Sequence, residues 1–353
     1  MIKENGFTLI ELMLALALGL VISAAAIFLF MTAQKSYSMQ QGLSSLQENA
    51  NFGLNYLTKD IRLANLNNVK AEMNDETAYG GIVLTSSINA QKDAANVPQS
   101  NFFRTIIGTT ANENLLSRSS GFAPGTAPAW TGASNVQVNS TDLLSDQLVI
   151  QYVPQYKIDD RGTPDENDDL LKGGFDCEGR ELTFPVHDQK NGQPYGQQVI
   201  VQRYFLRADD NVDTNEPNSP LALACDAGAY SIQPQPTAIR NYGDQGEIVM
   251  KRVDYFRVLL TVQNANSTFR YVSLSDYSAL PIPRPKIIAL QLGVLSRSTP
   301  PVGQEISIKD DQQFKVLDQT VTVKKDTTST KKYVRQVATQ TIAIRNALGE
   351  RGK

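Results

Sequence analysis

The stretch that decides the fold is Gly6-Phe7-Thr8-Leu9-Ile10-Glu11, which follows a short polar leader and precedes an apolar run from Leu12 to Met31. A helix over this run would be about 30 Å long, which matches the hydrocarbon core of a bilayer. Glu11 is a carboxylate at the edge of the run, and such a group is costly there unless it pairs with a cation. The sequence therefore predicts a membrane-spanning helix whose first turn carries a carboxylate in need of a positive partner.

Two simpler interpretations account for the apolar run less well. A secretory signal peptide would use Ser23-Ala-Ala-Ala26 as its cleavage site, but the leader lacks a net positive region and apolar residues continue from Ile27 to Met31. A plain single-pass anchor explains the span, but it gives no reason for Gly6 followed by Phe-Thr-Leu-Ile-Glu.

The stretch from Gly6 to Leu12 closely resembles the processing site of type IV pilins and of the pseudopilins of type II secretion. The resemblance implies that a prepilin peptidase cleaves between Gly6 and Phe7 and that Phe7 is then N-methylated. It also implies that Glu11 pairs with the N-terminal amine of a neighbouring subunit during assembly. An α-amine has a pKa of about 8 and is a cation at neutral pH, so the pair is chemically reasonable.

The first third of the chain can hold one very long helix, because all 16 prolines lie at or after Pro98. Beyond the membrane segment, apolar residues recur every three or four positions and form one stripe. We expect a leader at 1–6, a transmembrane and assembly helix at 7–31, and an amphipathic helix at 32–66 that packs on the head and ends near Asn65. The stripe consists of Leu43, Leu46, Ala50, Leu54, Leu57, Ile61 and Ala64.

The remainder, 67–353, is expected to be a β-rich periplasmic head with a loop-rich insertion at about 67–145. That insertion is rich in Asn, Ser, Thr, Gly and Ala, with short strands at 81–84 and 102–107. The predicted fold class is therefore α+β, a long membrane-spanning helix packed against a large, mainly antiparallel head. The main strands are predicted from β-branched and aromatic residues at 147–153, 181–186, 198–207, 249–262, 269–274, 287–295 and 333–345.

The chain has two cysteines, Cys177 and Cys225, and a formal net charge of −3 in 353 residues. An exported chain passes through an oxidising compartment, so we expect these cysteines to form a disulfide. Two free thiols are the alternative, and a metal site is disfavoured because His187 is the single histidine. The near-balanced charge indicates neither a nucleic-acid surface nor a basic membrane face.

Two acidic loops offer oxygen ligands at alternating positions, as flexible calcium loops do. Neither matches the EF-hand pattern, and solvated turns are the favoured interpretation. Calcium is the alternative, and otherwise no cofactor is expected. The candidate ligands are Asp159, Asp165 and Asp168 in the first loop and Asp209, Asn211 and Asp213 in the second.

The sequence contains no recognisable catalytic motif, neither HExxH nor GxSxG nor a P-loop, so the chain is predicted not to be an enzyme. A basic stretch lies near the C-terminus, and a solvated hairpin is favoured there over contact with DNA. This stretch comprises Lys324, Lys325, Lys331, Lys332 and Arg335.

The long head, the helix end Leu57-Thr-Lys-Asp-Ile-Arg62 and the closing Thr341-Ile-Ala-Ile-Arg345-Asn346 look like PilW-type minor pilins and, more distantly, J-type minor pseudopilins. The resemblance implies a single-pass inner-membrane protein with its head in the periplasm, later carried onto the cell-surface pilus. It would join a minor-pilin complex that primes or tips pilus assembly. Its partners would be other minor pilins, the major pilin, the prepilin peptidase, the inner-membrane assembly machinery and the lipid bilayer. The alternatives are a type II secretion minor pseudopilin and a membrane-anchored periplasmic binding or adhesive module.

Overall fold

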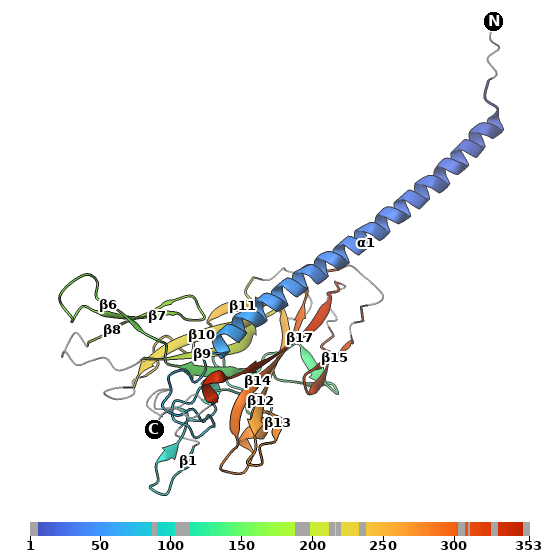
Figure 1. Cartoon of the computed structure of the whole chain (residues 1–353). Helices are drawn as coiled ribbons and strands as arrows, with labels where there is room; N and C mark the ends of the chain where they lie inside the picture. The colour runs from blue at the N-terminus through green and yellow to red at the C-terminus, as the bar shows by residue number, and fades with distance from the viewer. Residues whose placement is uncertain are drawn as a thin grey trace.

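The computed structural model consists of one long helix that projects from a β-rich head (Figure 1). It describes residues 6–86, 90–102, 113–187, 198–211, 216, 220–232, 238–302, 308–309, 311–325 and 331–348. Helix α1 spans Leu9–Ile61, and at 1.5 Å per residue its 53 residues extend about 80 Å. The long N-terminal helix and antiparallel β-rich head expected from the sequence are both confirmed.

Two four-stranded antiparallel sheets form the centre of the head. The first has the order β11-β10-β9-β5, and the second has the order β13-β12-β14-β17. The bounds of the first are β5 Leu148–Tyr152, β9 Gln198–Ala208, β10 Leu221–Ser231 and β11 Glu247–Lys251. Those of the second are β12 Val253–Gln263, β13 Phe269–Ser273, β14 Lys286–Arg297 and β17 Arg335–Ala343.

Smaller sheets surround this centre, and the pairings between their strands are antiparallel as well. One has the order β15-β16-β3-β4, with β15 Gln313–Val316, β16 Gln319–Val323, β3 Val136–Val138 and β4 Thr141–Asp142. Another joins β6 Lys157–Asp159, β7 Leu170–Phe175 and β8 Glu181–Pro185. A short pair joins β1 Gln91–Lys92 and β2 Pro98–Gln99. The short helices are η1 Glu113–Leu115, α3 Leu274–Ser278 and η2 Arg345–Ala347.

The C-terminal part of α1 packs on the head and contacts β11, β14 and β17. Its buried face includes Leu46, Leu57 and Ile61, each fully buried, and Leu57 and Ile61 join the largest apolar cluster of the head. The predicted stripe is thus present, except that Leu43 is 38% exposed and Ala64 lies beyond the helix. Helix packing of this kind, rather than intrinsic propensity, supplies most of the stability of a helix in a protein.

Helix α1 ends at Ile61, four residues before the expected end at Asn65. Residues 62–67 form turns, and Asn65 adopts a left-handed φ of 63°, which asparagine tolerates better than most residues. The buried Asn65 side chain donates to the carbonyl oxygens of Lys70, Ala71 and Asn346. These bonds hold the turn that leads the chain away from the helix axis.

The predicted strand 249–262 is wrong as one element. It is two strands, β11 and β12, that belong to different sheets. Arg252 separates them with a φ of 56°, and its buried guanidinium pairs with Asp209 and Glu216. Residues 81–84 form only an isolated bridge, between Ile82 and Ile150, and most of 102–107 lies outside the described residues.

The remaining predicted strands have counterparts with slightly different ends. β10 was missed by the sequence analysis although its eleven residues are all buried. Its sequence, LALACDAGAYS, is rich in Ala and carries Gly228 and Asp226, which are poor strand formers. Close packing explains the glycine, because a Cβ on Gly228 would lie 2.6 Å from the carbonyl oxygen of Arg240.

Candidate functional site

The first turn of α1 forms a capping box. Thr8 is the N-cap, and its backbone N–H and hydroxyl donate to Glu11 Oε2 at 2.9 and 2.8 Å. The N–H of Glu11 donates in return to the Thr8 hydroxyl at 3.3 Å. This reciprocal pattern starts a helix and fixes the Glu11 carboxylate at the N-terminal end of α1. Both groups lie after Gly6, so cleavage following that residue would leave the box intact.

The apolar segment of α1 projects away from the described part of the head (Figure 1). Phe7 is 89% exposed, and the large side chains from Leu9 to Met31 are between 54% and 77% exposed. The helix is long and apolar enough to cross a membrane, and none of its most apolar window is buried. An exposed apolar surface of this length requires lipid or other apolar helices around it. The segment therefore fits membrane anchoring.

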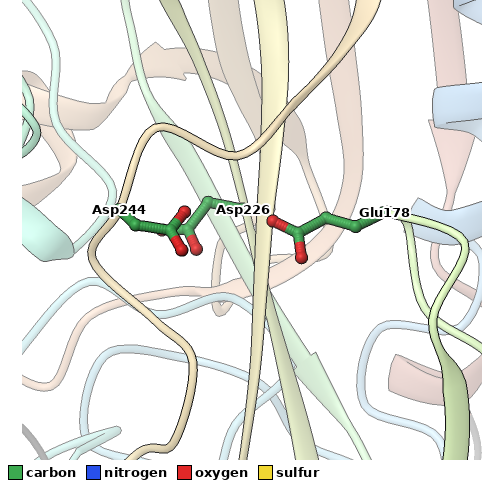
Figure 2. A group of neighbouring side chains, drawn as sticks. All are labelled: Glu178, Asp226 and Asp244. Atoms are coloured by element: carbon green, nitrogen blue, oxygen red, sulfur yellow. The ribbon is translucent and has the colours of Figure 1, made fainter.

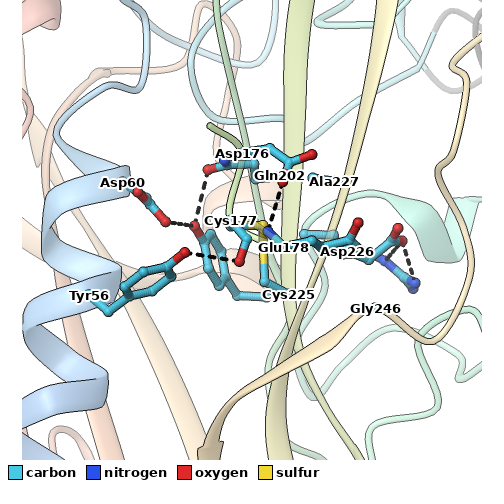
Figure 3. The surroundings of a disulfide bond; sticks show 12 residues. Tyr56, Asp60, Asp176, Cys177, Glu178, Gln202, Cys225, Asp226, Ala227 and Gly246 are labelled. Atoms are coloured by element: carbon cyan, nitrogen blue, oxygen red, sulfur yellow. Dashed lines mark hydrogen bonds and ion pairs between the residues drawn. A yellow bond between two sulfur atoms is a disulfide. The ribbon is translucent and has the colours of Figure 1, made fainter. Parts of the chain in front are cut away.

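The opposite end of α1 is fixed to the head by buried polar contacts (Figure 3). Tyr204 on β9 donates to Asp60 Oδ2 at 3.0 Å, and Tyr56 donates to the carbonyl oxygen of Cys177 at 3.0 Å. Asp60 is 8% exposed, and this burial raises the pKa of its carboxyl to about 6, against the opposing hydrogen bond from Tyr204. In the sequence Asp60 lies between the stripe residues Leu57 and Ile61, and no local pattern marks it as buried.

The expected disulfide between Cys177 and Cys225 is present, with the two Cα atoms 6.2 Å apart. It joins the turn between β7 and β8 to the fully buried strand β10. Glu178 and Asp226 directly follow the two cysteines and are therefore brought together by the bridge. In Figure 3 the disulfide lies beside the helix contacts of Tyr56 and Asp60.

The structure gives the first acidic loop local partners. Asp159 forms an ion pair with Lys172 at 2.8 Å, and Asp165 accepts from the backbone and side chain of Asn167. Asp168 accepts from the hydroxyl of Thr163 at 2.7 Å. These bonds are the ones that exposed turn residues form without a metal ion.

The second acidic loop is neutralised from elsewhere in the fold. Asp209 pairs with Arg252, which also donates to the carbonyl oxygen of Asn211 at 3.1 Å. Glu216 pairs with Arg252 and Arg297 at 2.7 Å. Asp213 lies outside the described residues, so calcium at this loop stays a prediction.

Within the described residues, the group of acidic side chains close enough to hold a metal ion is a different one. It consists of Glu178, Asp226 and Asp244, whose carboxylate oxygens lie within 4.8 Å of one another (Figure 2). The sequence contained one sign of it, an acidic residue immediately after each cysteine.

The basic stretch near the C-terminus is largely paired within the head. Lys324 lies 3.0 Å from Asp142, and Arg335 lies 2.7 Å from Asp254. Lys332 donates to the carbonyl oxygen of Ile308. Cations with internal partners contribute little to a surface for nucleic acid.

Comparisons with known proteins match both ends of the chain. The family model of the prokaryotic N-terminal methylation motif matches residues 1–27, and that of type IV pilus-assembly protein W matches residues 211–346. A type IV-like pilin from Thermus thermophilus is among the solved structures that match. It is 12% identical, with 61% of this chain and 83% of that chain covered and a TM-score of 0.25. No curated protein matches.

A methylation motif at the start of an exposed apolar helix, followed by a head with a region similar to a pilus-assembly family, defines the class: the chain is a type IV pilin-like protein. Its residues 211–346 are similar to type IV pilus-assembly protein W, so the chain is related to pilus assembly. Similarity to these families indicates a structural rather than an enzymatic protein, and neither family indicates a cofactor. It also implies interaction with other pilins and with the assembly machinery.

Proposed function

We propose that this protein is a minor pilin that is processed between Gly6 and Phe7 and joins a complex of minor pilins that primes or tips a type IV pilus. The observation that supports this proposal most directly is helix α1 itself. From Leu12 to Met31 it exposes an almost entirely apolar surface, its second half packs on the head, and its first turn presents Glu11. Such a helix can leave the bilayer only if other apolar helices replace the lipid.

In this proposal the protein starts as a single-pass protein of the inner membrane with its head in the periplasm, and it ends in the pilus on the cell surface. The division into leader 1–6, transmembrane and assembly helix 7–31, amphipathic segment 32–66, which is helical only as far as Ile61, and head 67–353 follows the same scheme. Its partners are the prepilin peptidase, the inner-membrane assembly machinery, other minor pilins and the major pilin. The match to a pilus-assembly family favours this function over that of a type II secretion pseudopilin.

Glu11 is the residue proposed to guide assembly. A carboxylate inside a bundle of apolar helices is tolerated only when paired, and the amine of a processed neighbour is a suitable cation. In the single chain the Glu11 carboxylate accepts hydrogen bonds from the backbone and hydroxyl of Thr8. These bonds hold the carboxylate in a fixed position while the first turn stays helical.

Mass spectrometry of the membrane-extracted protein tests processing. The expected N-terminus is Phe7 with an added methyl group in cells that contain the peptidase. A mature protein that begins at Met1, or near Ala25, contradicts the proposal.

Two substitutions at Glu11 separate charge from capping. Glu11→Gln keeps the capping box, since Gln serves at this position as well as Glu, but removes the charge. Glu11→Ala removes both. If the charge pairs with a neighbouring amine, both variants insert into the membrane and both fail to copurify with other pilins. Normal piliation with Glu11→Gln would show that only the cap matters. Glu48→Gln, an exposed site on the same helix, is the control.

A further inference from the structure

The three carboxylates beside the disulfide come from separate parts of the head. Glu178 lies in the turn between β7 and β8, Asp226 on β10, and Asp244 in the loop before β11. Figure 2 shows the Glu178 carboxylate directed toward Asp226, with the carboxylates of Asp226 and Asp244 adjacent. Their ligand oxygens lie within 4.8 Å of one another. A single small cation can therefore contact all three.

One oxygen of this group is buried and has no donor. Asp226 is fully buried, and its Oδ2 takes the ion pair with Arg203 at 2.7 Å and the N–H of Gly243 at 2.9 Å. Among the described residues none donates a hydrogen bond to Oδ1. A buried carboxylate oxygen without a partner is costly, and native proteins rarely leave one so. A ligand at this oxygen would remove that cost.

The charges around the group are also unbalanced. Among the described residues, the three carboxylates have ion pairs with two guanidinium groups, Arg203 on Asp226 and Arg180 on Glu178, and Arg180 also pairs with Asp176. Asp244 is exposed, so the group opens to solvent on its side.

The disulfide fixes this arrangement. Glu178 and Asp226 each directly follow one of the bridged cysteines, so the bond between Cys177 and Cys225 holds their backbones together. A metal site preorganised by a covalent bond loses less conformational entropy when the ion binds.

We propose that Glu178, Asp226 and Asp244 bind a calcium ion. All the ligand atoms are hard carboxylate oxygens, and they come from three elements in an irregular arrangement, which calcium accepts more readily than magnesium. Because two of the three carboxylates already form ion pairs with arginine, the site should bind calcium weakly. The expected dissociation constant lies in the range of about 10⁻⁴ to 10⁻³ M that extracellular calcium modules show.

Equilibrium dialysis of the full-length protein in detergent against radioactive calcium measures this binding. One ion per chain, released by chelator, is expected. Asp244→Asn should weaken binding at least about tenfold, because it removes a charged ligand. Its amide oxygen can still accept the Gly246 N–H, now bonded to Asp244 at 2.8 Å, so the loop keeps its conformation. Glu247→Gln removes a nearby exposed carboxylate and should leave calcium binding unchanged.

A second measurement, the unfolding midpoint with and without calcium, distinguishes a loss of binding from a variant that fails to fold. Calcium should raise the unfolding midpoint of the wild-type chain, and it should raise that of Asp244→Asn by clearly less. The proposal is overturned if no saturable binding occurs in millimolar calcium. It is equally overturned if Asp165→Asn abolishes binding while Asp244→Asn and Glu178→Gln do not, because the ion would then lie in the acidic loop.

Discussion

Replacing Asp60 by Asn should make the protein more stable at neutral pH, although Asp60 is hydrogen-bonded in the native structure. The carboxyl group is 8% exposed at the junction of α1 and β9. Its pKa is raised from the ordinary value of 3.8 to about 6, chiefly by burial. Asn can still accept the hydrogen bond from Tyr204, but it does not have to carry a charge in the buried site.

The sign and size of the effect follow from the pKa. A carboxyl whose pKa is raised in the folded state holds its proton more tightly there than in the unfolded chain. Its contribution to stability is therefore fully present below pH 3.8 and is lost as the pH rises through about 6. A difference of about two units between the folded and unfolded pKa of Asp60 corresponds to about 3 kcal/mol of folding free energy. The wild-type protein is less stable by about this amount at neutral pH, where Asp60 is charged.

Chemical unfolding of wild-type and Asp60→Asn protein, measured at a series of pH values, tests this reasoning. The single tryptophan, Trp130, is 2% exposed in the head and reports its unfolding by fluorescence. The two proteins should be similar near about pH 4, and the variant should become more stable by about 2 to 3 kcal/mol above about pH 7. Other buried acids, such as Asp146, titrate equally in both proteins and cancel in the difference.

Glu48→Gln, which changes an exposed carboxylate on the same helix, should show no such dependence on pH. The reasoning is refuted if the stability difference between wild type and Asp60→Asn does not change between about pH 4 and pH 7. It is also refuted if the variant is less stable than wild type at neutral pH, since the charged form would then be the preferred one.

Three further substitutions test the packing of the head. Cys177→Ser should destabilise it by about 4 kcal/mol, as the chain-entropy model gives for a bridge across 48 positions, and quantitative alkylation of both thiols without reductant would contradict the bridge. Leu57→Ala should cost about 2 to 5 kcal/mol in denaturant unfolding because Leu57 is fully buried, whereas Phe52→Ala at a 72% exposed site of the same helix should cost less than about 0.5. Gly81→Ala should cost about 1 to 3 kcal/mol, because its Cβ would lie 2.2 Å from the backbone nitrogen of Asn65, and an unchanged unfolding midpoint would show that this turn can move.

Local periodicity was enough to predict the helix and most of the long strands. The spacing of Leu46, Leu54 and Leu57 places them on one face of α1, and that face is the buried one. Strand β10 escaped because its Ala- and Gly-rich sequence lacks the β-branched residues that mark a strand, and its burial on both sides is a property of the neighbouring strands.

The features that depend on contacts between distant residues could not be predicted. The break at Arg252 depends on Asp209 and Glu216, which lie more than thirty positions earlier in the chain. The same contacts explain why the second acidic loop has partners that its own sequence does not contain. The buried state of Asp60 likewise depends on Tyr204, 144 positions away.

The way in which α1 joins the head has a mechanical consequence. Its contacts run along the helix from the buried Gly42 to Ile61, and Asn49 and Tyr56 add hydrogen bonds to the head between these points. A pull along the helix axis would load these contacts in shear, so they would share the force rather than break one after another. Tyr56 donates its hydrogen bond to the carbonyl oxygen of Cys177, and the disulfide links Cys177 covalently to Cys225 on the buried strand β10. A force on the helix is therefore transmitted to this strand. The head is thus built to stay attached to α1 when the helix is under tension.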